Sequence, residues 1–461
     1  MKELIEKIID RVPDYKEFLT VEEMDSNSKK LAEKYPDIVE IFEMGKTREK
    51  NSIYCLKIGK GKKNGLMFGC PHPNEPIGAM MLEYFTEELA KNKELREKLD
   101  YTWYIVKSWD VDGTKLNEKW FKGPFTLYNY SRNFFRPAGH QQVDWTFPVD
   151  YKNLHFHETI PETKAMMNLI DEIKPKFIYS LHNAGFGGVY WYLTDDTKDI
   201  YDDLKNAAKK QNIPLNLGEP EAPFVEAYEP AIYKNLGIQQ NYDYLEKYGV
   251  ENPEKVINAG TCSADYAIEV ADSFTMLTEL PYFYEERIND LSEADMTRKE
   301  AVLKRIEFDE DSNKFIKETM NNIENYLDKK NPFKLALEAF TDSEKSNEAT
   351  KKMIEENEEF LRNATVAEKF DNLYISKFYK LLSYGLLVRA SESELEKIDK
   401  SEKQTEKYKK LEEAFETAKK ALKDLSENLE KEINYQVVPI KKLVSIQLEC
   451  GLIMADYLNR N

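Results

Sequence analysis

Cysteine and histidine are both scarce in this chain of 461 residues, which contains four of the first and five of the second. The four cysteines (Cys55, Cys70, Cys262 and Cys450) lie far apart, and no two of them form a C-x-x-C pair. This spacing argues against a disulfide framework and against a thiolate metal site. We expect the cysteines to pack as small apolar side chains.

An excess of positive charge and long apolar runs are also missing. Lysine and arginine number 66 against 84 aspartates and glutamates, so the net charge is −18. Nucleic acids and anionic membranes bind clustered positive charge, and we therefore expect neither as the main partner. Residues 1–18 carry a charge every few positions, which is typical of an amphipathic helix rather than a signal peptide. Because no run is long enough to span a bilayer, we expect a cytoplasmic protein.

The chain is nevertheless long enough for one large α/β domain and a smaller second domain. Up to about Glu285, short apolar runs alternate with amphipathic helical patterns. This alternation predicts an α/β fold with three layers (α/β/α) around a mixed sheet, over residues 1–330. The apolar runs are typical of strands buried on both faces, and they cover residues 53–59, 65–70, 103–109, 177–182, 189–194 and 274–280.

After about residue 290 the pattern changes to long, charged helical segments. Apolar residues at alternating spacings of four and three indicate a coiled-coil-like seam, and a more apolar helix follows Pro439. We predict an all-helical C-terminal domain over residues 331–461 that docks on another surface, and self-association through this tail stays open. The seam comprises Leu411, Phe415, Ala418, Leu422, Leu425, Leu429 and Ile433.

The sequence PHPNEP places His72 three residues before Glu75, directly after an apolar run. Catalytic zinc typically takes three protein ligands from histidine, glutamate or aspartate and keeps one position open for water. The prolines around His72 and Glu75 favour the sharp turn that would bring both side chains to one metal. His182 ends another apolar run, and in open α/β sheets ligands gather where strands end. These three residues form a candidate metal site.

Two further features bear on this site. Glu279 ends the apolar run of SFTMLTELPYF, where a carboxylate either caps the strand or acts as a general acid or base. The segment LHFHE offers a rival metal site with His155, His157 and Glu158, since alternate residues of a strand point the same way. It has no apolar strand behind it, and we favour the first site although H-x-x-E alone is a weak signal.

Five motifs, taken in order, resemble those of the zinc carboxypeptidase family. The family pattern is H-x-x-E, an aspartate-glycine turn, an arginine-asparagine pair, a histidine ending a strand and a glutamate ending a later strand. Here these motifs are PHPNEP, DVDG, SRNFF, SLHN and LTEL. The resemblance covers about residues 15–325, including a long helix that closes the domain, and implies the α/β/α fold of the family. The helical tail lies outside it.

The resemblance also implies roles for single residues. His72, Glu75 and His182 match the ligands of one Zn²⁺ per chain, and Glu279 matches the catalytic glutamate. The chemistry agrees, since zinc brings the pKa of bound water towards about 7 and a neighbouring carboxylate can take the proton. Arg132 matches the arginine that binds the terminal carboxylate of the substrate, and a planar guanidinium can bond both of its oxygens.

Several substrate-binding positions depart from the family pattern. Ser131 replaces the asparagine that normally precedes the carboxylate-binding arginine. The floor of the specificity pocket falls on Ala264, so we expect no buried charge that selects a charged side chain. Phe121 stands where an arginine normally steadies the oxyanion, which leaves Lys122 or Arg136 as substitutes.

The remaining departures concern a tyrosine and an aspartate. The substrate-capping tyrosine falls on Ile257, and Tyr266 or Tyr282 could fill its role from another direction. Asn129 stands where an aspartate usually orients the first zinc histidine, which is expected to soften metal affinity.

These features predict a zinc-dependent metallocarboxypeptidase that hydrolyses the C-terminal amide bond of a peptide or peptide-like substrate with a free carboxylate. The altered positions around Arg132 keep a second hydrolase open, namely a zinc amidohydrolase or deacylase, or a cell-wall peptide hydrolase. A third hypothesis is an inactive binding module whose tail recruits a partner. The retention of Glu279 argues against it, because a binding module has no need of a general base.

Overall fold

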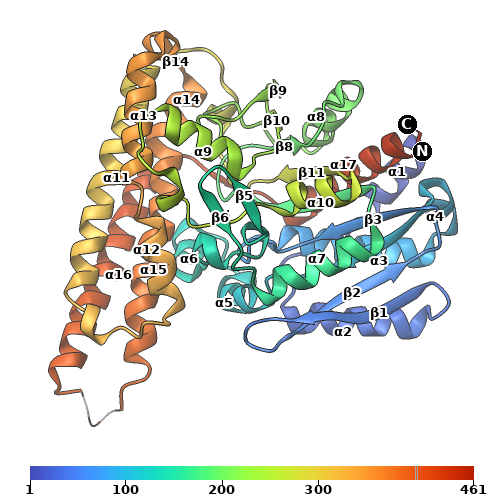
Figure 1. Ribbon diagram of the computed structural model, residues 1–461, viewed down its shortest axis with the longest axis horizontal. Helices are drawn as coiled ribbons and strands as arrows, with labels where there is room; N and C mark the ends of the chain where they lie inside the picture. Colours follow the sequence, from blue (N-terminus) through green and yellow to red (C-terminus); the bar gives the residue numbers. More distant parts are fainter. Residues whose placement is uncertain (400, 402, 461) are drawn as a thin grey trace.

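A nine-stranded mixed β-sheet forms the centre of the molecule (Figure 1). The computed structural model describes residues 1–399, 401 and 403–460. The six apolar runs predicted as strands are all strands and lie next to one another in the sheet, which confirms the expected fold class. In spatial order they are β2 (Ser52–Ile58), β4 (Tyr101–Val106), β3 (Lys63–Phe68), β7 (Phe177–His182), β11 (Phe274–Glu279) and β8 (Tyr190–Leu193).

The strands at the two edges of the sheet were not predicted. They are β1 (Val39–Lys46) on one side, and β10 (Ile232–Lys234) followed by β9 (Ala227–Glu229) on the other. An edge strand is only partly buried, so it lacks the continuous apolar run that marks a central strand. In the centre, β4, β3, β7 and β11 are parallel. The register of β7 and β11 sets His182 directly opposite Glu279.

Helices cover both faces of the sheet. One face carries α3 (Ile77–Lys91), α8 (Tyr201–Lys210) and α17 (Ile440–Arg460). The other carries α7 (Pro161–Ile173) and α10 (Ser263–Ala271), which pack against each other. Each of these helices turns its apolar side to the strands, which completes the three layers.

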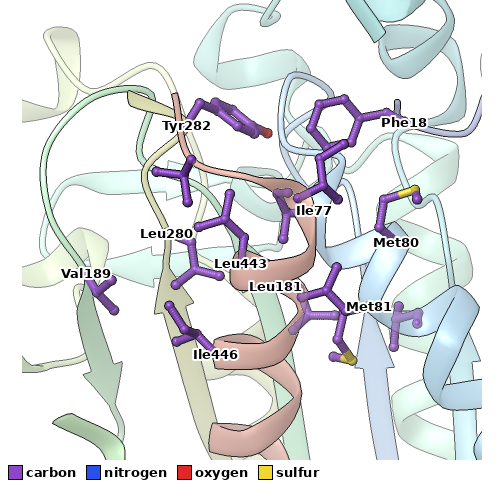
Figure 2. Close-up of a cluster of buried hydrophobic side chains, with 14 of the residues drawn as sticks. Phe18, Ile77, Met80, Met81, Leu181, Val189, Leu280, Tyr282, Leu443 and Ile446 are labelled. Atoms are coloured by element: carbon purple, nitrogen blue, oxygen red, sulfur yellow. The ribbon is translucent and has the colours of Figure 1, made fainter. Parts of the chain in front are cut away.

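Helix α17 does not lie with the other helices of residues 331–461. It packs against α3 and α8 and touches β7. Figure 2 shows Leu443 and Ile446 next to Leu181 and Leu280, near the carboxyl ends of β7 and β11. The Tyr179 hydroxyl donates to the Gln447 carbonyl at 2.8 Å. A Cβ atom at residue 451 would lie 2.6 Å from the Tyr179 ring, so this close approach requires Gly451. The last helix of the chain is therefore part of the α/β core.

The other C-terminal helices form a bundle beside the sheet (Figure 1). It begins with α11 (Arg298–Asn321), the long helix expected to close the catalytic domain, which instead packs against α15. The predicted seam lies along α16, where Leu411, Ala418, Leu422 and Leu429 are fully buried. The remaining helices are α12 (Pro332–Phe340), α13 (Glu344–Glu356), α14 (Val366–Phe370), α15 (Ser376–Leu395) and α16 (Glu406–Glu432). The boundary predicted at residue 330 falls inside this bundle, between α11 and α12.

Among the described residues, no helix combines the length and the apolar character that crossing a membrane requires.

Candidate active site

The turn between β3 and α3 presents His72 and Glu75. The chain leaves β3 through Cys70, whose φ is 51°, and enters α3 at Pro76. The Glu75 amide donates to the His72 carbonyl at 3.1 Å, which closes a tight turn. Both side chains are almost completely buried. The prolines that suggested a sharp turn thus direct the imidazole and the carboxylate to the same point.

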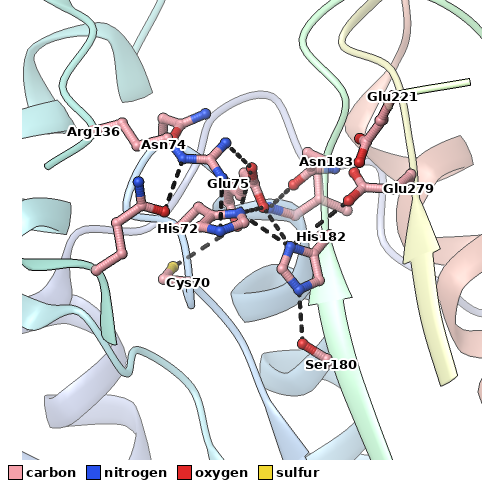
Figure 3. A network of polar contacts seen from close by, with 12 residues as sticks. Cys70, His72, Asn74, Glu75, Arg136, Ser180, His182, Asn183, Glu221 and Glu279 are labelled. Atoms are coloured by element: carbon pink, nitrogen blue, oxygen red, sulfur yellow. Dashed lines mark hydrogen bonds and ion pairs between the residues drawn. The ribbon is translucent and has the colours of Figure 1, made fainter. Parts of the chain in front are cut away.

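The ends of two parallel strands supply the other groups. His182 is the last residue of β7 and Glu279 the last of β11, and both are buried. Figure 3 shows the four side chains converging at this sheet edge. Glu75 Oε1 lies 3.0 Å from His72 Nδ1, Glu75 Oε2 lies 3.0 Å from His182 Nδ1, and the two Nδ1 atoms are 3.1 Å apart.

This donor set suits a zinc ion. Zn²⁺ bonds to nitrogen and oxygen are about 2.0–2.1 Å long, which in a tetrahedral site spaces neighbouring ligand atoms about 3.3 Å apart. Among the described residues, His72, Glu75 and His182 are the single group of this kind able to hold a metal ion. Burial and the positive charge of Arg136 lower the pKa of His72 to about 3, so this imidazole is neutral. Although burial opposes ionisation of Glu75, the neighbouring imidazoles lower its pKa.

The outer nitrogens of the two histidines have different partners. His182 Nε2 lies 2.7 Å from the Ser180 hydroxyl, which can accept its hydrogen. His72 Nε2 lies 2.7 Å from Arg136 Nη2. The resemblance placed Asn129 where an aspartate usually orients the first zinc histidine. Its side-chain amide instead donates to the Pro124 carbonyl. Because a guanidinium only donates, Arg136 can bond Nε2 only while that nitrogen has no hydrogen.

We expect loss of metal when either histidine is removed. Purified wild-type protein should contain about one zinc per chain, and His72→Ala and His182→Ala should contain almost none, because two protein ligands hold zinc poorly. Elemental analysis after dialysis against a weak chelator is the measurement. His155→Ala is the matched control and should keep its zinc. Unchanged zinc in either active-site variant would contradict this assignment.

Glu279 lies beside the three candidate ligands. Its Oε1 is 3.7 Å from His182 Nδ1. Burial raises the pKa of Glu279 well above its usual range, and the carboxylates of Glu75 and Glu221 add to this effect. A carboxylate with a raised pKa binds a proton more readily than an ordinary glutamate, which suits a group that must take a proton during a reaction.

The three predicted substrate contacts have different locations. Ala264 lines the cavity in front of the candidate ligands. Arg132 does not, because its Nη2 pairs with Glu392 of α15 at 2.5 Å. Ser131 is fully buried where α6 (Leu127–Asn133) meets α15, and a Cβ atom at residue 385 would clash with its carbonyl. The bundle therefore occupies the side on which the sequence placed a carboxylate clamp.

The residues proposed to replace the oxyanion arginine and the capping tyrosine also lie in different places. Arg136 lines the cavity and lies 3.6 Å from Glu75, whereas Lys122 pairs with Glu17 and Glu23 on the surface. The Tyr282 hydroxyl is buried in a hydrogen bond to Asn183.

Tyr266 does not line the cavity either, and its hydroxyl donates a hydrogen bond to Asp171. The tyrosine that does line the cavity from the bundle side is Tyr379 of α15, more than a hundred residues beyond the expected position.

The cavity has a volume of about 850 Å³ and is lined on one side by α11, α13 and α15. Sequence reasoning missed Glu221, Tyr190 and Tyr192, which all line it. A signal for the two tyrosines was present, since residues 190 and 192 of one strand point to the same face. Glu221 lies in an irregular loop without a pattern.

The rival histidines lie elsewhere. His155 and His157 both contact Asp150 on the hairpin of β5 (Val149–Tyr151) and β6 (Leu154–Phe156), where their side chains are about 60% exposed. The neighbouring Glu158 adds no third ligand atom at this point of the described chain.

Comparison with known proteins agrees with this geometry. Residues 24–296 match the profile of the family described as zinc carboxypeptidase. Mast cell carboxypeptidase A from Mus musculus is 32% identical over 114 residues, 23% of this chain and 27% of that protein. The same enzyme from Homo sapiens is 25% identical over 240 residues, 45% of this chain and 57% of that protein. The alignments thus span about a quarter and just over half of these two relatives.

Solved structures give weaker matches. Carboxypeptidase A from Helicoverpa armigera aligns with a TM-score of 0.36 and 16% identity, over 61% of this chain and 71% of that chain. A murein-tripeptide amidase from Escherichia coli O157 aligns with a TM-score of 0.28 and 13% identity, over 52% of this chain and 82% of that chain.

Proposed function

The chain belongs to the zinc carboxypeptidase family, and on this basis we propose that it is a zinc-dependent hydrolase that cleaves the C-terminal amide bond of a peptide or peptide-like substrate. The observation that carries the proposal is the convergence of His72, Glu75 and His182 with Glu279 at one edge of the sheet. As further proposals, the protein is cytoplasmic, holds one zinc per chain, and has neither nucleic acid nor membrane as a partner.

The residues around the site have different roles in the proposed hydrolysis. Zinc bound to the three ligands would supply a Lewis acid that polarises the substrate carbonyl and lowers the pKa of water. Glu279 takes the proton of the attacking water at a carboxylate oxygen and passes it to the leaving nitrogen. Ser180 holds the His182 ring through Nε2.

Arg136 is the cation best placed to meet negative charge in the cavity. When His72 Nδ1 binds a metal, Nε2 carries the hydrogen and can no longer accept from Arg136. The guanidinium then keeps Glu75 and Gln142 as neighbours and has donors left for a carboxylate or a developing oxyanion. Arg136 therefore takes the role that the family resemblance gave to Arg132.

One observation favours a second candidate function. Because Arg132 is bound to Glu392, the expected carboxylate clamp is absent from its usual place. The same metal chemistry would then act on an amide without a terminal carboxylate, as in a zinc amidohydrolase, a deacylase or a cell-wall peptide hydrolase.

Matched substrates separate the two functions. We expect kcat/KM to be about tenfold to a hundredfold higher for a peptide with a free C-terminal carboxylate than for its amide, because a charge-assisted bidentate contact is worth about 1.5–3 kcal/mol. Arg136→Gln should lose this preference and Arg132→Gln, its matched control, should keep it. Equal wild-type rates on both peptides would instead support the amidohydrolase.

A further inference from the structure

A carboxylate without a cationic partner lies next to the general base. Glu221 lines the cavity, and Figure 3 shows its carboxylate facing that of Glu279 at the end of β11. Its oxygens accept hydrogen bonds from the hydroxyls of Tyr190 and Tyr192, the second at 3.1 Å. Within the described chain, no lysine, arginine or histidine forms an ion pair with Glu221.

The loop that carries Glu221 is fixed in place. Two residues earlier, Glu219 forms a bidentate pair with Arg298 of α11, at 2.5 Å and 3.0 Å. The Glu219 amide also donates to Asp371 at 2.9 Å. Together with the two tyrosine hydroxyls, these contacts hold the Glu221 carboxylate at the cavity wall. Its position is therefore built by the strand β8 and by the helical bundle together.

The surroundings of Glu221 suit a positive charge. Tyr190, Tyr192 and Tyr233 form a cluster of rings with centroids 5.6–6.2 Å apart, and Tyr379 lines the same cavity from α15. Aromatic faces attract ammonium and guanidinium groups.

The wall also offers an unused acceptor. Asn372 lines the cavity and is 1% exposed, and its Oδ1 has no hydrogen-bond partner. Its amide nitrogen is already used in a bond to the Glu368 carbonyl at 2.9 Å. A buried acceptor without a donor is costly, which marks this wall as polar on the bundle side.

We infer that Glu221 determines specificity for substrates with a cationic group, a primary ammonium or a guanidinium, close to the scissile amide. This inference rests on the proposed function and names its substrate class. The cation would pair with the Glu221 carboxylate and leave the Glu279 carboxylate free to take the proton of water. Because Ala264 is uncharged, the sequence suggested that no charge in the pocket selects the substrate side chain. Glu221, which lies in a different loop, would supply such a charge.

Peptide pairs that differ by one charge test the inference. One pair has lysine or norleucine beside the scissile bond, and a second has a free or an acetylated amino terminus, which separates a side-chain cation from a terminal one. We expect wild-type kcat/KM to be about tenfold to a hundredfold higher for the cationic member of at least one pair. Glu221→Gln should remove this preference, and Tyr190→Phe should weaken it.

The matched control is Glu226→Gln, which removes the same charge from an exposed residue paired with Lys234. It should keep the wild-type preference. Equal wild-type rates on both members of each pair, or a preference that survives in Glu221→Gln, would overturn the inference and leave the hydrolase proposal standing. Two zinc ions in wild type and one in Glu221→Gln would also overturn it, because a metal would then fill the place of the cation.

A binding measurement keeps the two proposals distinguishable. If no peptide is cleaved, the proposed function fails, and calorimetry with n-butylamine then decides the inference. Wild-type protein should bind the amine about tenfold more tightly than Glu221→Gln does. Equal affinities would overturn the inference.

Discussion

Glu279→Gln should abolish nearly all hydrolysis while the protein keeps its fold and its zinc. A glutamine amide fills the same space and can hydrogen-bond to water, but it cannot take a proton. Loss of one general base typically costs about 10²–10⁴ in rate. The end of β11 is buried, so solvent has little access to replace the missing base.

The measurement is kcat on the best peptide substrate, together with zinc content and thermal unfolding of the same preparation. Glu269→Gln, on the exposed side of α10, removes the same charge and should behave like wild type. A Glu279→Gln enzyme that retains zinc and more than about a tenth of the wild-type rate would show that another group takes the proton.

A chain that ends at Lys330 should fail to fold cooperatively. It loses α17, whose side chains Leu443, Ile446 and Met454 are buried against the sheet and its helices. Burying one large apolar side chain contributes about 1.5–3 kcal/mol. Thirteen residues of α17 are buried, so their loss is comparable with the whole stability of a domain, about 5–15 kcal/mol.

Circular dichroism during heating and size-exclusion chromatography would measure this outcome. A chain that ends at Leu458 is the control, since it keeps the buried part of α17 and should unfold within a few degrees of the full chain. Leu443→Ala offers a milder test and should lower the free energy of unfolding by about 2–5 kcal/mol. A chain ending at Lys330 that unfolds like the full protein would show that α17 contributes little.

The central strands and the candidate metal ligands could be predicted from the sequence for a common reason. A strand buried on both faces needs a continuous apolar run, and His182 and Glu279 each follow such a run directly. Parallel strands end at one edge, so residues at their ends meet without further information. Local patterns were sufficient here because the meeting point is set by the topology of the sheet.

The positions that could not be predicted depend on contacts between distant segments. The location of Arg132 is decided by Glu392, 260 residues later. The apolar side of α17 shows that the helix is buried, but periodicity does not tell which surface buries it. Glu221 reaches the cavity from a loop and Tyr379 reaches it from the bundle. The sequence around either residue does not indicate which side chains it contacts.

The return of α17 to the sheet has a consequence for biosynthesis. The α/β layers receive their last helix only after residues 298–439 have been translated. At about 5–20 residues per second, ribosomes need roughly 7–30 seconds for this stretch. During that time the apolar surface between α3 and α8, just behind His182, stays uncovered on the nascent chain. The catalytic layer is therefore completed only after the bundle helices have been translated, and the bundle has time to form first.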